Sequence, residues 1–210
     1  MTAPVVHSQD GQTALFGYGS LCSIASLERT LGRKYDGPFV NCQVEGWRRS
    51  WDVGMPNRAF FFDSPAGRVY PEHILYLNVR RDPASLLNGT LFLVDSEELK
   101  RFDGREWIYD RHPITDQLRG VKVEGGDAYL YVAKPEYIIK EAESPHHAAI
   151  RNSYIRILED AFRDLGEEFR AAYQRSTDVP PPQLIFEDQR DPEAQNPFAR
   201  NPASPVQSKG

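Results

Sequence analysis

The feature that most constrains the fold is a glycine-rich turn at residues 16–21, with the sequence FGYGSL. It joins an apolar run at 14–16 to a helix-start signal at Ser23, an order that predicts a strand, a tight turn and a helix. Gly17 and Gly19 allow a positive φ and let a ligand approach the backbone closely. Free N–H groups in such a turn can hold an anion, so we expect a carboxylate or a phosphate there.

Two nucleotide-binding motifs are excluded at this turn. A dinucleotide fingerprint needs a third glycine at position 22, which is Cys22, and the Gly-Lys-Ser/Thr of a P-loop does not occur. The alternative that the glycines serve packing alone stays open, because a lone Gly-x-Gly is a weak signal. A second motif has to decide between the two.

That second motif lies at 102–111, with the sequence FDGREWIYDR, after a helix-start signal at Asp95 with Glu98 in the capping-box position. Together the two motifs resemble the gamma-glutamylcyclotransferase-like superfamily. Its members carry a Tyr-Gly-Ser-Leu/Asn turn after the first strand and an acid in a Leu/Phe-Asp-x-x-Glu-x-x-Tyr-x-Arg segment. The resemblance covers Leu15 to Thr177 in the order of its elements.

The resemblance implies an enzyme that cyclises a gamma-glutamyl amine or peptide to 5-oxoproline, with Glu106 as general acid/base. The substrate supplies its own nucleophile, the α-amine, so a single carboxyl group can carry protons from the α-ammonium to the departing nitrogen. An apolar pocket, for which Trp107 and Ile108 are candidates, would raise its pKa toward neutrality. Asp103 and Asp110 are the rival acids, and Asp110 is a candidate exposed partner of Arg111. Glu106 as an ordinary surface carboxylate is the alternative.

The resemblance also implies a substrate-binding set. The turn would hold the substrate's α-carboxylate or carbonyl oxygen through backbone N–H groups, and a tyrosine at the start of the long helix would contact the substrate, with a core tyrosine as the alternative. The residues concerned are Gly17, Tyr18, Gly19, Ser20, Leu21 and Tyr154.

Neither a cofactor nor a metal ion is expected. His146 and His147 are adjacent and lack the i, i+4 spacing of a helical zinc site. Cys22 follows the turn but has no identifiable base, so it is interpreted as a packing residue, and both cysteines are expected to be free thiols.

Glutathione-specific members usually carry a tryptophan shortly after the turn, whereas this chain has LCSI at 21–24. The resemblance is therefore to the avirulence-induced-like branch, without glutathione specificity. The alternative function is a catalytically silent member that binds a small carboxylate metabolite, or a protein partner through a proline-rich tail.

Composition limits the remaining classes. With 210 residues, of which 40% are hydrophobic, we expect one domain at 13–178 between an N-terminal tail at 1–12 and a proline-rich, extended or disordered tail at 179–210. A net charge of −5 without a basic stripe argues against nucleic acid. The chain contains neither a signal-peptide pattern nor a long apolar run, so we expect a soluble, cytoplasmic protein without membrane contact.

Strands are expected at 42–51, 60–62, 74–79 and 89–94, with Pro83 ending the third, and Gly125-Gly126 is expected to join a hairpin of 120–123 and 128–132. Helices are expected from Ser144 to Leu165 and from Glu167 to Arg175. Strands joined by short turns predict an α+β fold with a mixed, largely antiparallel curved sheet or barrel flanked by helices. The fold of the resembling family, a small mixed barrel, agrees with this.

Overall fold

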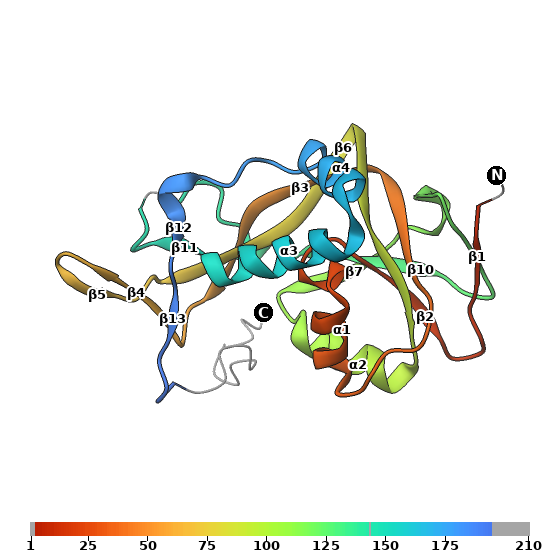
Figure 1. The fold of residues 1–210 in the computed structure, drawn as a ribbon, viewed down its shortest axis with the longest axis horizontal. Coiled ribbons are helices and arrows are strands. Elements are labelled where there is room, and N and C mark those ends of the chain that lie inside the picture. The colour runs from red at the N-terminus through yellow and green to blue at the C-terminus, as the bar shows by residue number, and fades with distance from the viewer. Residues whose placement is uncertain (1–2, 143, 195–210) are drawn as a thin grey trace, which may run out of the picture.

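The computed structural model describes residues 3–142 and 144–194, in which helices flank a curled, open sheet (Figure 1). The α-helices are α1 Ile24–Leu31, α2 Ser96–Arg105, α3 Asn152–Leu165 and α4 Glu167–Arg175, and the short 3₁₀ helices are η1 Ser20–Cys22, η2 Thr115–Gln117, η3 Pro135–Tyr137 and η4 Pro182–Leu184. The strands are β1 Val5–His7, β2 Thr13–Gly17, β3 Phe39–Pro56, β4 Phe60–Ser64, β5 Gly67–Val69, β6 His73–Val94, β7 Tyr109–Pro113, β8 Leu118–Arg119, β9 Lys122–Glu124, β10 Ala128–Ala133, β11 Ala148–Arg151, β12 Ile185–Phe186 and β13 Gln189–Arg190.

The sheet is built around β3 and β6, which pair antiparallel from Pro56 opposite His73 to Phe39 opposite Phe92. The far end of β6 pairs antiparallel with β2, and β2 pairs parallel with β10, which pairs antiparallel with β7. The start of β6 pairs parallel with β11. The expected α+β fold with a mixed, largely antiparallel curved sheet is therefore confirmed, and the sheet curls into an open half-barrel.

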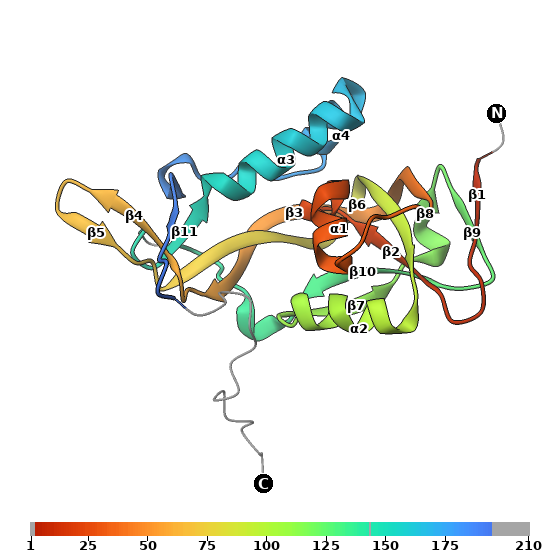
Figure 2. The same ribbon diagram turned by 60° about the horizontal axis from the view of Figure 1, so that its bottom comes forward.

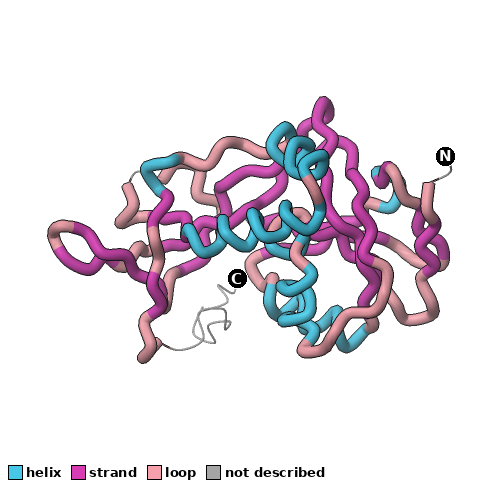
Figure 3. The backbone as a smooth tube through the Cα atoms, in the orientation of Figure 1, coloured by secondary structure: helices cyan, strands magenta, loops and turns pink. Residues whose placement is uncertain are grey.

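Helices cover the sheet from opposite sides, with α3 and α4 on one side and α2 on the other (Figure 2). Figure 3 distinguishes the helices from the strands of the sheet by colour. Leu158 of α3 and Phe169 of α4 belong to the larger buried cluster, together with Phe16. A second buried cluster contains Leu27 of α1 and Phe102 of α2. The turn between β2 and α1 therefore joins two hydrophobic cores, and burial on both sides holds it in place.

The expected capping signals are confirmed at two helices. Ser23 caps α1 by accepting the N–H of Ser26, and Gly32 ends it with a φ of 72°. Asp95 and Glu98 form a reciprocal capping box at the start of α2. None of the helices in the described residues has the length and hydropathy needed to cross a membrane.

The prediction of separate strands at 74–79 and 89–94 is wrong, because β6 is a single strand of 22 residues. Its pairing with β3 shifts register where Glu45 pairs with Leu86 but Trp47 pairs with Arg81. Pro83 lies in the extra segment that this shift leaves unpaired with β3, where the missing N–H of proline breaks no ladder hydrogen bond.

The predicted hairpin around Gly125-Gly126 is also wrong. Gly125 does turn the chain, with a φ of 85°, but β9 then pairs parallel with β1 and not with β10. β10 lies between β2 and β7 instead. β9 thus pairs with β1, from the N-terminal part of the chain, in place of the expected pairing with β10.

The long helix begins at Asn152 and not at Ser144, because residues 148–151 form β11. This strand lies between β6 and β12, which satisfy its backbone groups and bury Ala148 and Ile150. The short apolar run does not distinguish such a buried strand from the first turn of a helix.

The expectation that the chain beyond Pro180 carries no packed structure is wrong for residues 180–194. Leu184 is only 2% exposed, β12 pairs with β11, and β13 pairs with β4. The ring of Phe186 stacks on that of Phe62 with centroids 4.0 Å apart. The rest of the expected tail, residues 195–210, lies outside the described residues.

Candidate active site

The residues predicted as the site come together around one small cavity of about 40 Å³. It is lined by all of Gly17, Tyr18, Gly19, Ser20, Leu21, Glu106 and Tyr154. A wider pocket of about 490 Å³ shares Ser20, Glu106, Tyr109 and Tyr154 with this cavity. The two hollows thus meet at the candidate acid. That these residues bind or transform a substrate stays a prediction.

The reason for the glycines differs from the expected one. Neither Gly17 nor Gly19 has a positive φ, so the expectation of a left-handed turn is wrong. A Cβ on Gly17 would instead lie 2.7 Å from the Cβ of Leu21, and a Cβ on Gly19 would lie 2.8 Å from the hydroxyl oxygen of Tyr154. Close approach of the neighbouring chain, and not backbone handedness, requires glycine here.

The turn offers backbone donors to the small cavity. The N–H of Ser20 is directed at the hydroxyl of Tyr154. Within the described part of the chain, the N–H groups of Gly19 and Leu21 donate no hydrogen bond. Unpaired N–H groups at the start of a helical turn are suited to an anionic oxygen.

Arg49 of β3 supports the turn from behind. Its Nε donates to the carbonyl oxygen of Tyr18 at 2.7 Å, and the hydroxyl of Tyr173 donates to the same oxygen at 3.0 Å. The guanidinium is fully buried, lies 3.5 Å from the ring centroid of Tyr173 and donates to Asn88 and to Ser176. It forms no ion pair among the described residues, and burial lowers its pKa. A buried positive charge thus lies behind the anion-binding candidate.

Glu106 caps the C-terminus of α2, where its N–H donates to the carbonyl of Phe102 at 2.8 Å. Its side chain is 17% exposed, and one carboxylate oxygen lies 3.1 Å from Nε of Arg105. Burial raises the pKa of Glu106 above that of an ordinary glutamate, although the charge of Arg105 acts in the opposite direction. Such a carboxyl group can take up and return a proton nearer neutral pH.

Arg105 connects the acid to the turn, a role that the sequence argument missed. One terminal nitrogen donates to Oγ of Ser20 at 2.7 Å, and the other donates to Oγ1 of Thr30 in α1. Because its Nε also faces Glu106, this side chain fixes the position of α2 relative to the glycine turn.

Tyrosine hydroxyls surround the acid. Tyr18 donates to the carbonyl of Tyr131 at 2.7 Å, and Tyr109 donates to the carbonyl of Leu77 at 2.9 Å. Burial raises the pKa of Tyr18, Tyr109 and Tyr154, so all three stay neutral. Sequence reasoning missed Tyr109, although its position three residues after Glu106 in the second motif was a usable signal.

Tyr154 is a core residue, as one of its two expected roles required, and its contact with a substrate stays a prediction. It is 7% exposed, and its ring lies edge-on to Tyr76 and Trp51, with centroids 5.1 and 6.0 Å away. The residue nevertheless lines both hollows, and its hydroxyl lies beside Gly19 of the turn. It is a core residue whose polar end reaches the site.

The rival acids face a different hollow of about 520 Å³, which is lined by Asp103, Asp110 and Lys134 but not by Glu106. Asp103 lies 3.1 Å from Nε of Arg111, and Asp110 lies 3.7 Å from the Lys134 ammonium. The expected pairing of Asp110 with Arg111 is therefore wrong.

Ile108 and Trp107, the two apolar residues expected to surround Glu106, line different hollows. Ile108 is buried and lines the wider pocket, as expected. Trp107 packs edge-on against Tyr137 and lines the rival hollow, so it does not surround the candidate acid. Neighbours in sequence point in different directions here because the chain leaves α2 and enters β7.

Cys22 and Cys42 are free and buried, as expected. Burial raises the pKa of Cys22 to about 11 and that of Cys42 to about 12. Both thiols therefore stay protonated at neutral pH, which agrees with a packing role for Cys22.

Solved structures share this arrangement of elements. A protein described as gamma-glutamyl cyclotransferase matches over 84% of this chain and 94% of its own, with a TM-score of 0.50 and 10% identity. An uncharacterized human protein matches over 82% and 91%, with a TM-score of 0.53 and 13% identity. YkqA from Bacillus subtilis matches over 79% of this chain and 54% of its own, with a TM-score of 0.54 and 16% identity.

No protein-family model matches the chain, and no curated protein matches it in sequence. The likeness is thus one of three-dimensional structure at low identity, and it agrees with the fold that the two sequence motifs implied. The chain has the gamma-glutamylcyclotransferase-like fold.

Proposed function

We propose that the protein cyclises a gamma-glutamyl amine or peptide to 5-oxoproline, with release of the amine or amino acid and with Glu106 as general acid/base. The observation that supports this most strongly is the position of Glu106. This carboxyl group, whose pKa burial raises, lines the same small cavity as the unpaired N–H groups of the glycine turn.

The reaction needs one proton relay. The α-ammonium of the substrate gives a proton to the Glu106 carboxylate, and the resulting amine attacks the γ-carbonyl carbon. A carbon–nitrogen bond closes the five-membered lactam while the bond to the departing nitrogen breaks, and Glu106 gives its proton to that nitrogen. The regenerated carboxylate then takes the second proton from the lactam nitrogen and passes it to the released amine, which leaves as an ammonium ion. Two protons thus move from the α-nitrogen to the departing nitrogen, so atoms and charge balance and the enzyme ends as it began.

The turn would hold the substrate in the attacking conformation. An oxygen of the α-carboxylate or of the γ-carbonyl fits the donors at Gly19 and Leu21, with the charge of Arg49 behind them. Fixing the amine next to the carbonyl is the larger part of such catalysis, because it replaces a search among many substrate conformers.

The wider pocket suggests which leaving groups are preferred. Its charged lining consists of Glu106 and four arginines, namely Arg29, Arg101, Arg105 and Arg151. Arg29 is exposed and its side chain makes no ion pair or hydrogen bond among the described residues, whereas Arg151 lies 3.5 Å from Asp188. We therefore expect a leaving group that carries a carboxylate, as in an acidic gamma-glutamyl dipeptide, to be preferred over a simple amine.

The same arginines support the second candidate function, which is binding of a small carboxylate metabolite without turnover. The ion pair with Arg105 favours the charged form of Glu106 and so works against a carboxyl group that has to be protonated during the reaction.

The test is to incubate the protein with a panel of gamma-glutamyl compounds and to quantify 5-oxoproline by mass spectrometry. The panel pairs gamma-glutamyl-glutamate with gamma-glutamyl-propylamine, which differ in the charge of the leaving group. We expect turnover of both, with the lower KM for the dipeptide. Binding without 5-oxoproline would favour the silent alternative.

Arg29→Gln tests the leaving-group preference separately. It should raise KM for the acidic dipeptide and leave KM for the propylamide unchanged, because only the dipeptide carries negative charge on its leaving group. An equal change for both substrates would contradict the preference while leaving the cyclisation itself untouched.

A further inference from the structure

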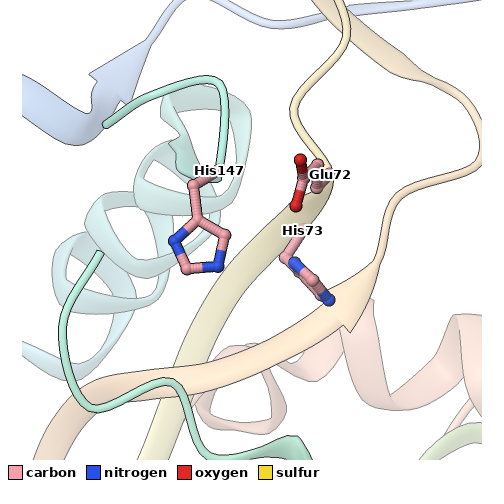
Figure 4. Close-up of side chains that lie close together, drawn as sticks. All are labelled: Glu72, His73 and His147. Atoms are coloured by element: carbon pink, nitrogen blue, oxygen red, sulfur yellow. The ribbon is translucent and has the colours of Figure 1, made fainter. Parts of the chain in front are cut away.

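We propose that Glu72, His73 and His147 form a binding site for a divalent transition-metal ion, with Zn²⁺ the best match to the donor set. The three side chains lie at the start of β6 and in the loop before β11 (Figure 4), and they do not line the cavity at the glycine turn. Each offers one ligand atom, and these atoms lie within 4.8 Å of one another.

The backbone places the two histidines side by side. The N–H of His73 donates to the carbonyl of His147 at 3.0 Å, and the N–H of Glu72 donates to the carbonyl of His146 at 2.8 Å. These bonds continue the parallel pairing of β6 with β11, in which His73 is opposite Ala148. The spacing of the donors is therefore set by the sheet, and a metal ion would not have to assemble it.

One ring nitrogen of the cluster points to a missing ligand. Nδ1 of His73 is buried and has no hydrogen-bond partner in the structure. His147 turns its other ring nitrogen, Nε2, toward His73 and Glu72 (Figure 4). A buried imidazole nitrogen without a partner is unfavourable, because it has lost its water and gained nothing in return. The rings meet only edge-on, with centroids 5.8 Å apart.

The donor types indicate the class of metal. Two imidazoles and one carboxylate suit Zn²⁺ and other first-row divalent ions better than Ca²⁺ or Mg²⁺, which favour sets of oxygen ligands. Metal–ligand distances near 2.1 Å place tetrahedral donors about 3.3 Å apart, so small rotations of the side chains close the site. Glu72 is exposed, which lets its carboxylate move and leaves a side open to water.

Such an ion would tie the beginning of β6 to the segment before β11. The sequence argument weighed only His146 and His147, which are adjacent, and could not see that His73 lies beside His147. The partner arrives from a strand more than seventy residues earlier in the chain.

The experiment titrates the full chain, first stripped with a chelator, with Zn²⁺ in a calorimeter and measures the thermal midpoint. We expect one ion per chain and, at a large excess over Kd, a rise in Tm of about 5 °C. His147→Gln should abolish the binding, and Glu72→Gln, a change of an exposed side chain, should weaken it at least about tenfold.

His146→Gln is the matched control, because it removes the neighbouring imidazole, which is exposed and outside the cluster. It should bind Zn²⁺ as the wild type does. Absence of Zn²⁺ binding in the wild type would overturn the proposal. Equal affinity in wild type, His147→Gln and Glu72→Gln would also overturn it, because the ion would then be bound elsewhere.

Discussion

Glu106 and Asp103 lie three residues apart at the end of α2, yet their surroundings differ in kind. The Glu106 side chain is 17% exposed, and it faces the glycine turn across a cavity. The Asp103 side chain is 40% exposed, accepts a hydrogen bond from Tyr131 and pairs with Arg111. Of these two carboxyl groups, Glu106 is the one that is both largely removed from water and directed at the cavity beside the turn. The proposed acid/base role requires both properties.

Glu106→Gln should have the largest effect, because it keeps the shape of the side chain and removes its ability to carry a proton. We expect kcat to fall by about 10²- to 10⁴-fold, with substrate binding largely kept. Turnover assays and calorimetry measure the two separately. Unchanged turnover in the variant would remove Glu106 from the mechanism and favour the binding alternative.

Gly19→Val tests whether the turn completes the site of Glu106. A Cβ here would meet the hydroxyl of Tyr154, which is packed against two other rings, so we expect loss of ligand binding and a destabilisation of about 1–3 kcal/mol. Gly104→Ala is the control, since its Cβ meets nothing within 4 Å. It should not lower Tm. Normal substrate affinity in Gly19→Val would contradict the binding role of the turn.

The pH dependence of activity and of Tm tests whether Glu106 is the buried acid of the two. Because burial raises the pKa of Glu106 in the folded state, activity should fall on the acid side as this carboxylate becomes protonated, at a pH above the ordinary range of a glutamate. Burial favours the protonated form of Glu106 and so contributes to the free energy of unfolding. This contribution is complete below the pKa that Glu106 has in the unfolded chain, and it is lost as pH rises through its pKa in the folded protein. Glu106→Gln should therefore gain in Tm relative to wild type as pH rises over this window. Parallel Tm curves for the two proteins would show that burial does not shift this group.

Asp103→Asn and Asp110→Asn should have the smallest effects on catalysis, because both acids line the other hollow. We expect kcat/KM to stay within about threefold of wild type for both, since neither would handle the proton. Asp103→Asn should cost slightly more stability, because it weakens the contact with Arg111. A loss as large as that of Glu106→Gln would remove the distinction between the two regions.

Local chemistry made much of this molecule predictable. Ser23 and Gly32 bound α1, Asp95 and Glu98 begin α2, and these signals need no distant partner. The predicted site residues also come together in the structure, since the first motif follows β2 and the second leads into β7, with only β10 between these strands. A resemblance in the order and spacing of motifs therefore located the cavity.

The sequence-based predictions that were wrong concern segments whose structure depends on partners distant in sequence. A proline ends a strand only where the ladder needs an N–H at its position, and the register shift against β3 removes that need at Pro83. Ala148–Arg151 becomes a strand because β6 and β12 flank it. Residues 182–190, at the beginning of the expected tail, pack on the domain because β12 pairs with β11 and β13 pairs with β4. Arg105 and Arg49 were missed for the same reason, as their partners come from other elements.

The burial of Arg49 has a consequence for how ligand affinity responds to ionic strength. Mobile ions screen exposed charges over about 10 Å at 0.1 M salt, but they do not enter the protein interior. The attraction of Arg49 for an anion at the turn should therefore persist at high salt, whereas the contribution of the exposed Arg29 should decline. At high salt, the affinity of the turn for a carboxylate should therefore persist, whereas the preference for a charged leaving group should be lost.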